Sequence, residues 1–122
     1  MKGSVLLIDD EADLVQAMKD YLEDEGLDVT TASNGKEALE KLSSKNMPDI
    51  IILDMKMPIM DGRTFAHIFH ERFDDDAPII LVSGDANAQK NALSIQATGW
   101  IEKPFKLDEL LSKINEYVPD AP

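Results

Sequence analysis

The sequence contains no cysteine and few basic residues, and each shortage excludes a class of protein. Without cysteine the chain has no disulfide framework, no thiolate zinc site and no cysteine nucleophile. Only 12 lysines and arginines stand against 24 aspartates and glutamates, which gives a net charge of -12. Because a surface this acidic repels phosphate groups, we expect the chain to bind neither nucleic acid nor membranes.

Long hydrophobic runs are also missing. The longest aliphatic runs have four residues each, and the first of them stops at Asp9, so we expect neither a membrane span nor a secretory signal. These features and the lack of cysteine predict a cytoplasmic protein. The 122 residues, of which 43% are hydrophobic, suffice for one domain with an ordinary core. We expect that domain to span residues 1–118, with residues 119–122 as a tail or the start of a linker.

Short apolar runs alternate with helical patterns along the chain. Three runs are continuous and aliphatic, as in strands buried on both faces of a parallel sheet, and they lie at residues 5–8, 50–53 and 79–82. Weaker strand candidates lie at residues 28–31 and 100–101. Apolar residues recur at helical spacing within residues 14–22, 38–42, 65–69, 88–95 and 107–118, whereas residues 72–78 indicate a solvated loop. This order predicts a doubly wound (βα)₅ domain of the α/β class.

Polar residues follow the predicted strands, at the edge of the sheet where open α/β folds bind ligands. Asp9 and Asp10 follow the first strand and Asp54 follows the third, so the three carboxylates converge if these strands flank the switch point. Such a cluster favours a hard cation with oxygen ligands, such as Mg²⁺. Ser83 and Lys103 follow the last two strands, where a hydroxyl and an ammonium group can hold phosphoryl oxygens. A carboxylate can itself be the nucleophile, which gives an aspartyl phosphate.

At these positions the sequence resembles the receiver domain of bacterial two-component response regulators. The resemblance covers about residues 4–117, and the segments that carry it are LLIDDE (6–11), DIIILDMKMPIMDG (49–62), LVSGDA (81–86) and ATGWIEKPF (97–105). It implies a flavodoxin-like fold with five parallel strands in the order 2-1-3-4-5. It also implies a phosphorylation-activated signalling switch, which is not a conventional enzyme because it catalyses only its own phosphorylation and dephosphorylation.

The resemblance also implies a metal site and a phosphoacceptor. Asp54 would accept the phosphoryl group. Asp10 would bind Mg²⁺ directly, Asp9 would bind it through water, and the backbone carbonyl of Lys56 would complete the protein ligands.

Further roles follow from the same resemblance. Ser83 and Lys103 would hold the phosphoryl oxygens, Trp100 would be the aromatic switch residue, and the peptide bond before Pro104 would be cis. A sensor histidine kinase or a histidine phosphotransfer protein would be the phosphodonor. The fourth helix, fifth strand and fifth helix would contact a downstream protein or a covalently linked effector domain.

Two residues differ from those usual in receiver domains, and a third bears on the lifetime of the phosphoryl group. Ile59 and Gln96 stand where the family commonly has glycine, and Gln96 predicts either a strained helix end or a different one. The polar segment 88–95 is the candidate for the least stable helix. Lys56 predicts slow autodephosphorylation if its side chain blocks attacking water and pairs with Asp85; the alternative is that it points to solvent and offers only its carbonyl.

Other classes of protein share parts of this pattern. A phosphatase with a carboxylate nucleophile uses a D-x-D motif, whereas Met55 and Lys56 follow Asp54. A nucleotide-binding protein needs a glycine-rich loop where this chain has three acids, and the same acids disfavour a flavodoxin-like redox cofactor without metal. A phosphorylation-independent interaction module is the remaining alternative, and acetyl phosphate would not label it.

Taken singly, each site residue also has an ordinary structural explanation. Asp10 can cap a helix, Ser83 can stabilise a turn, and Lys103 can be a solvated surface lysine. His67 and His70 are three residues apart but no third ligand is evident, which favours surface or helix-packing roles. Only the combination of residues at the strand ends indicates a phosphorylation site.

Overall fold

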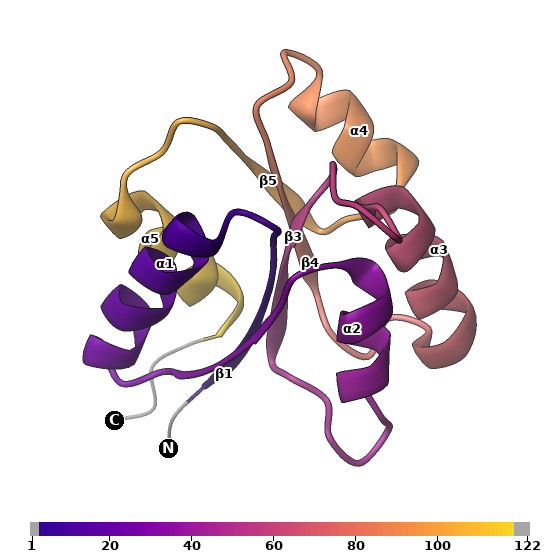
Figure 1. The fold of residues 1–122 in the computed structure, drawn as a ribbon, viewed down its shortest axis with the longest axis horizontal. Helices are drawn as coiled ribbons and strands as arrows, with labels where there is room; N and C mark the ends of the chain where they lie inside the picture. The colour runs from indigo at the N-terminus through magenta and orange to yellow at the C-terminus, as the bar shows by residue number, and fades with distance from the viewer. Residues whose placement is uncertain (1–2, 119–122) are drawn as a thin grey trace.

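A computed structural model describes residues 3–118, in which five strands alternate with five helices (Figure 1). The order is β1 (Ser4–Ile8), α1 (Ala12–Asp24), β2 (Asp28–Ala32), α2 (Gly35–Lys41), β3 (Ile50–Asp54), α3 (Gly62–Phe73), β4 (Ile79–Ser83), α4 (Ala88–Ser94), β5 (Gly99–Glu102) and α5 (Leu107–Tyr117). The alternation confirms the predicted (βα)₅ organisation. Within the described residues no helix is both long and apolar enough to cross a membrane.

The strands form one parallel sheet in the order β2-β1-β3-β4-β5, as expected. Helices α1 and α5 cover one face, and α2, α3 and α4 cover the other (Figure 1). Ile8 of β1 lies beside Ala32 of β2 and Leu53 of β3, so the sheet grows in both directions from β1. The ends of β1 and β3 therefore flank the switch point, where an open α/β sheet binds its ligand.

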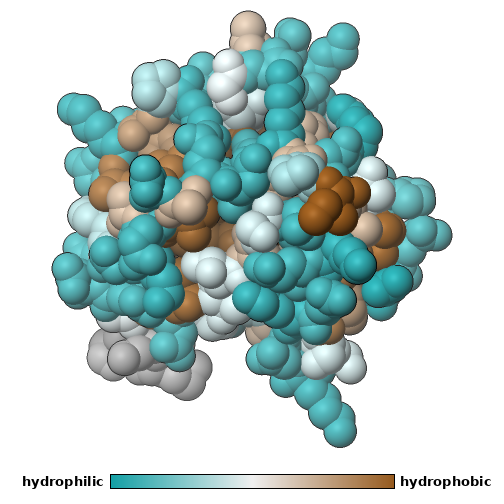
Figure 2. All heavy atoms as spheres, in the orientation of Figure 1, coloured by the Kyte–Doolittle hydropathy of each residue, from teal (hydrophilic) through white to brown (hydrophobic). Residues whose placement is uncertain are grey.

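The core consists of two apolar layers, one on each face of the sheet. Strands β3 and β4 are buried along their whole length, which explains their unbroken aliphatic sequences. On the α2–α4 face, Phe65 stacks on Phe69 with ring centroids 5.9 Å apart. On the other face, Met18 of α1 and Ile114 of α5 belong to one buried cluster. The exterior seen in Figure 2 is mostly hydrophilic, in agreement with the composition.

Two helices begin where the sequence carries capping residues. The Asn34 side chain accepts a hydrogen bond from the amide of Glu37 at 2.8 Å, and the Asp61 side chain accepts one from the amide of Thr64 at 2.9 Å. Each carbonyl or carboxylate oxygen satisfies an amide that the first helical turn leaves unpaired. The Asp61 cap fixes the start of α3, immediately after the loop that follows Asp54.

The loop predicted at residues 72–78 begins later than expected, so the prediction is wrong at its first residues. Helix α3 continues through Arg72 to Phe73, because Phe73 still packs on the core and its ring lies 5.5 Å from that of Phe69. The chain then turns at Asp74, whose φ is +52°. Ala77 is buried again, so the solvated part is shorter than expected. The proposed tail at residues 119–122 lies outside the described residues.

Ile59 and Gln96, which stand at positions where glycine was expected, both adopt the left-handed backbone conformation. Gln96 has φ +57° and ends α4, where the amide of Ala97 donates to Ala92 O at 2.9 Å in a Schellman arrangement. The strained alternative of the two predicted helix ends is therefore correct. Ile59 has φ +69° and is 79% exposed, although β-branched residues rarely adopt this conformation.

The two histidines differ in their surroundings. His67 pairs with Glu71 on the surface, whereas His70 is largely buried, with Nε2 3.1 Å from the carbonyl oxygen of Ile95 and Nδ1 3.2 Å from that of Asp74. His70 thus connects α3 to the end of α4, which confirms a helix-packing role.

We expect His70→Ala to lower the free energy of unfolding by about 1 kcal/mol, because it removes hydrogen bonds that hold the end of α4. His67→Ala should change that free energy by less than about 0.5 kcal/mol, since it alters only an exposed pair. Urea unfolding of both variants measures the difference. Equal effects would show that the His70 contacts add nothing to stability.

Candidate functional site

Three carboxylates converge at the switch point of the sheet. Asp9 and Asp10 follow β1, Asp54 ends β3, and each offers a carboxylate oxygen within 4.8 Å of the others. Asp9 and Asp54 are buried, whereas Asp10 is exposed. The structure therefore brings together the three acids that the sequence placed at one site. An all-oxygen set that opens to water suits a hard divalent cation.

The backbone around the acids is fixed by short contacts. The amide of Asp9 donates to Ala32 O at 3.1 Å, and Asp9 Oδ1 accepts from the amide of Glu11 at 3.0 Å. The loop after β3 folds back so that the amide of Gly62 donates to Met55 O at 2.9 Å. A side chain at Gly62 would place its Cβ 2.5 Å from the carbonyl oxygen of Asp54, so only glycine allows this approach.

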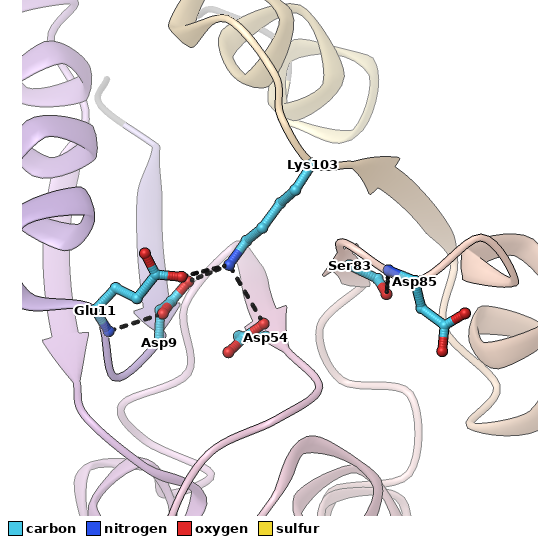
Figure 3. Close-up of polar contacts among 6 residues, drawn as sticks. All are labelled: Asp9, Glu11, Asp54, Ser83, Asp85 and Lys103. Carbon is cyan, nitrogen blue, oxygen red and sulfur yellow. Dashed lines mark hydrogen bonds and ion pairs between the residues drawn. The ribbon is translucent and has the colours of Figure 1, made fainter.

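Lys103 reaches into the cluster from the end of β5 (Figure 3). Its Nζ lies 3.2 Å from Glu11 Oε1, 3.4 Å from Asp9 Oδ2 and 3.5 Å from Asp54 Oδ1. The next peptide bond, Lys103–Pro104, is cis, as expected. The ammonium group is thus shared by two acids of the cluster and one at its rim.

The protonation of Asp54 reflects its crowded surroundings. Burial, followed by the neighbouring Asp9 carboxylate, raises the pKa of Asp54 from 3.8 to about 6, although Lys103 acts in the opposite direction. Burial alone would lower the pKa of Lys103, but the charges of Asp54 and Asp9 outweigh it and raise that pKa. Near neutral pH the site therefore holds a charged lysine and an ionised but destabilised aspartate.

The raised pKa of Asp54 leads to a prediction about the stability of the fold. The folded state binds the Asp54 proton more tightly than the unfolded state does, so the ionised group destabilises the fold above about pH 6, and this effect disappears as the pH falls towards 4. With allowance for solvent screening, Asp54→Asn should stabilise the protein by about 1–2 kcal/mol at pH 8 without added metal. Urea unfolding at pH 8 and pH 4 checks this. A gain of the same size at both pH values would rule out ionisation as the cause.

Ser83 lies on the side of Asp54 that faces away from Asp9 and Glu11 (Figure 3). The residue is buried, its Oγ accepts a hydrogen bond from the amide of Asp85 at 3.1 Å, and its carbonyl accepts one from the amide of Lys103 at 2.8 Å. Because Oγ is the acceptor in this contact, its own proton can be donated to another oxygen. The hydroxyl and the ammonium group are thus held at the edge of one site.

The described structure has no direct ion pair between Lys56 and Asp85, so this part of the interpretation is wrong. Asp85 Oδ1 instead accepts from the amide of Asn87 at 2.9 Å, and this hydrogen bond is the main reason why the pKa of Asp85 is lowered, although the charge of Lys56 contributes to lowering it. Lys56 is exposed, and it lines the same cavity of about 370 Å³ as Asp10, Asp54 and Ser83. The backbone carbonyl of Lys56 stays a predicted metal ligand.

The sequence alone indicates no role for Glu11. Glu11 makes the shortest of the three contacts with Lys103, and the only sequence signal was a third acid after Asp9 and Asp10. Trp100 is half-buried on β5 and packs against the core. Its role as a switch residue stays a prediction.

Comparison with known proteins assigns this arrangement to a family. Residues 5–115 match the sequence model of the response regulator receiver domain. The chain belongs to this family. Receiver domains are the phosphorylation-activated switches of two-component systems, so the resemblance seen in the sequence is confirmed and a phosphorylation-independent module is not favoured.

Individual relatives agree with the assignment to the receiver domain family. The chain is 32% identical to the transcriptional regulatory protein CrdR of Helicobacter pylori over 100% of its own length and 58% of that protein. It spans about half the length of the curated relatives it matches, for instance 48% of the response regulator SaeR of Staphylococcus aureus, with 36% identity over 91% of the chain.

Solved receiver structures share the whole fold. The chemotaxis protein CheY4 of Vibrio cholerae is 32% identical, with a TM-score of 0.86 over 96% of this chain and 99% of that one. The response regulator TrrA of Thermotoga maritima, solved in complex with Mg²⁺-BeF, is 33% identical, with a TM-score of 0.83 over 96% and 99% of the two chains. The flavodoxin-like architecture of this receiver domain is therefore confirmed.

Proposed function

We propose that Asp54 is the phosphoacceptor of this receiver domain and that the reaction requires Mg²⁺. The observation that carries the proposal is the buried Asp54 carboxylate, which lies beside two other acids and 3.5 Å from the Lys103 ammonium group. Burial and the neighbouring Asp9 carboxylate raise the pKa of Asp54, so its oxygen is more basic than that of an exposed aspartate, and the cavity gives a phosphoryl group access to it.

Asp9, Asp10 and Asp54 fit a Mg²⁺ ion because they offer only oxygen ligands, and the exposure of Asp10 leaves room for water. The TrrA relative was solved with Mg²⁺-BeF, which supports the same ion here. The backbone carbonyl of Lys56 is our proposed further ligand. When bound, the ion would offset the negative charge on the phosphoryl oxygens.

The phosphodonor is a phosphohistidine on a sensor histidine kinase or a histidine phosphotransfer protein, and we expect the reaction in the cytoplasm. An oxygen of Asp54 forms a bond to phosphorus as the bond from phosphorus to the histidine nitrogen breaks. Lys103 and Ser83 hold the transferred oxygens by charge and by hydrogen bonding. The product is an aspartyl phosphate on this chain and a free histidine on the donor.

Phosphorylation then shifts an equilibrium between two conformations, with Ser83 drawn towards the phosphoryl group and Trp100 turned inward. The surface formed by α4, β5 and α5 is the proposed contact for a downstream protein or a linked effector domain. Leu93 of α4 is 70% exposed, as expected for a residue that a partner covers.

Labelled acetyl phosphate tests the proposed function. We expect one phosphoryl group per chain in the presence of Mg²⁺ and none when the metal is chelated. Labelling should also quench or enhance the emission of Trp100, the only tryptophan. A chain that stays unlabelled with Mg²⁺ would support the interaction-module alternative.

The lifetime of the phosphorylated state should depend on Lys56. Its exposed side chain borders the cavity, where it can obstruct the water that attacks phosphorus opposite Asp54. We expect Lys56→Asn to accelerate hydrolysis about threefold or more, which requires only about 0.7 kcal/mol at the barrier. Asp85→Ala should have little effect because the ion pair is not formed. The measurement is loss of label after removal of the donor.

Lys45→Asn is the matched control, because it makes the same exchange at an exposed position in the loop between α2 and β3. An unchanged or slower decay in Lys56→Asn would leave Lys56 with only its backbone carbonyl at the site.

A further inference from the structure

The side chain of Glu11 contacts the functional site and makes no capping hydrogen bond with its own helix. It occupies the N-cap position of α1 with extended backbone angles, yet its side chain makes no capping hydrogen bond. A capping side chain would satisfy an unpaired amide of the first turn. The Glu11 carboxylate instead contacts the Lys103 ammonium group at 3.2 Å, while the Glu11 amide donates to Asp9 Oδ1 at 3.0 Å (Figure 3).

The three partners of Lys103 are not equivalent. Asp9 and Asp54 belong to the group of converging carboxylates, and both are buried. Glu11 lies outside that group, and its side chain is 62% exposed. The ammonium group is therefore placed between the cluster and a counterion at the rim.

This placement matters because Lys103 and a divalent cation compete for the same oxygens. The ammonium group contacts Asp9 Oδ2 and Asp54 Oδ1, two of the carboxylates that the metal needs, and like charges repel each other at this range. Lys103 must move away from these oxygens when the cation binds. A carboxylate at the rim lowers the free energy required for that movement, because Lys103 keeps an ion pair.

We propose that Glu11 is a positioning residue that acts through Lys103: it holds the ammonium group at the rim of the cluster so that a cation can bind, and it keeps Lys103 within reach of the phosphoryl group. The proposal rests on the proposed function of the site. It assigns a role to the third acid after β1 that neither metal ligation nor helix capping explains.

A double-mutant cycle of Glu11→Gln and Lys103→Gln tests the proposal, with Mg²⁺ affinity measured by calorimetry on the unphosphorylated chain. Glu11→Gln should weaken Mg²⁺ binding about threefold or more, and Lys103→Gln should strengthen it. In the Lys103→Gln background, Glu11→Gln should have no larger effect than Asp13→Asn. Asp13→Asn is the matched control. Asp13 is an exposed acid on α1 with no contact to Lys103, and its substitution removes the same charge.

The possible results separate this proposal from the function of the site. An equal loss of affinity from Glu11→Gln in both backgrounds would show that Glu11 attracts the cation directly, and this would overturn the proposal. An effect in the wild-type background no larger than that of Asp13→Asn would overturn it too. If the wild-type chain binds no Mg²⁺, the metal part of the proposed function fails, and the role of Glu11 fails with it.

Discussion

Asp54→Asn should lower the rate of labelling by acetyl phosphate at least about 100-fold, the largest effect that we expect of any single change. The amide is nearly the same size as the carboxylate, so the fold and the cavity persist, but the nucleophilic oxygen is lost. The same variant should be more stable than the wild type at pH 8, because the raised pKa of Asp54 means that its ionised form destabilises the fold. Loss of labelling in a more stable protein excludes unfolding as the cause.

Asp24→Asn is the control for this experiment. Asp24 is an exposed acid at the far end of α1, so the substitution removes the same charge away from the site. It should be labelled at the wild-type rate. Labelling of Asp54→Asn at that rate would assign the phosphoacceptor role to another residue. Slow residual labelling of Ser83 is compatible with the mechanism, because Ser83 lines the same cavity as residue 54.

Asp10→Asn should abolish the response to Mg²⁺ and, with it, the labelling. Asp10 is the exposed member of the cluster, so it is the most accessible ligand for the incoming ion. We expect Mg²⁺ affinity to fall at least about tenfold, because even the loss of a residue that only supports a metal ligand has an effect of this size. Calorimetry measures the affinity, and we expect the emission of Trp100, the only tryptophan, to respond to the binding.

Asp13→Asn again serves as the control, since it makes the same exchange three residues further along without touching the cluster. Its Mg²⁺ affinity should stay within about twofold of the wild type, as expected for an exposed and screened charge. If Asp10→Asn bound Mg²⁺ and were labelled like the wild type, Asp10 would have no part in metal binding.

The sequence predicts most of the site because parallel sheets place strand ends predictably. Continuous aliphatic segments identify β1, β3 and β4, and the residues that follow them must meet at one edge of the sheet. The convergence of Asp9, Asp10 and Asp54 also requires that β1 lie next to β3, and the resemblance to receiver domains supplied that strand order. Predicting it requires no knowledge of side-chain conformations, since the backbone topology alone brings the residues together.

Contacts that depend on side-chain conformations were predicted less well. The Lys56–Asp85 pair was wrong because a local hydrogen bond from the Asn87 amide holds Asp85, and a long, exposed lysine has little to gain from a screened pair. The role of Glu11 was missed for the opposite reason. Lys103 is more than 90 residues away in sequence, and nothing in the local pattern shows which acid it contacts.

Gln96 shows where the sequence leaves two backbone conformations open. Either a strained or a different helix end was expected there, and the structure has the strained, left-handed end, with β5 beginning a few residues later. A residue with a side chain is strained in this conformation by up to about 1 kcal/mol, which the surrounding packing offsets. The short α4, which lacks a side-chain cap at Asn87, stays our candidate for the least stable helix.

The position of the phosphoryl group on the chain tests directly whether Asp54 is the phosphoacceptor. Phosphorylated protein is treated with borohydride, which reduces the acyl phosphate, and the proteolytic peptides are sequenced by mass spectrometry. We expect the peptide containing β3 to be modified at Asp54 and nowhere else. Modification of Asp9, Asp10 or Ser83 in the wild-type protein, with Asp54 unmodified, would contradict this prediction.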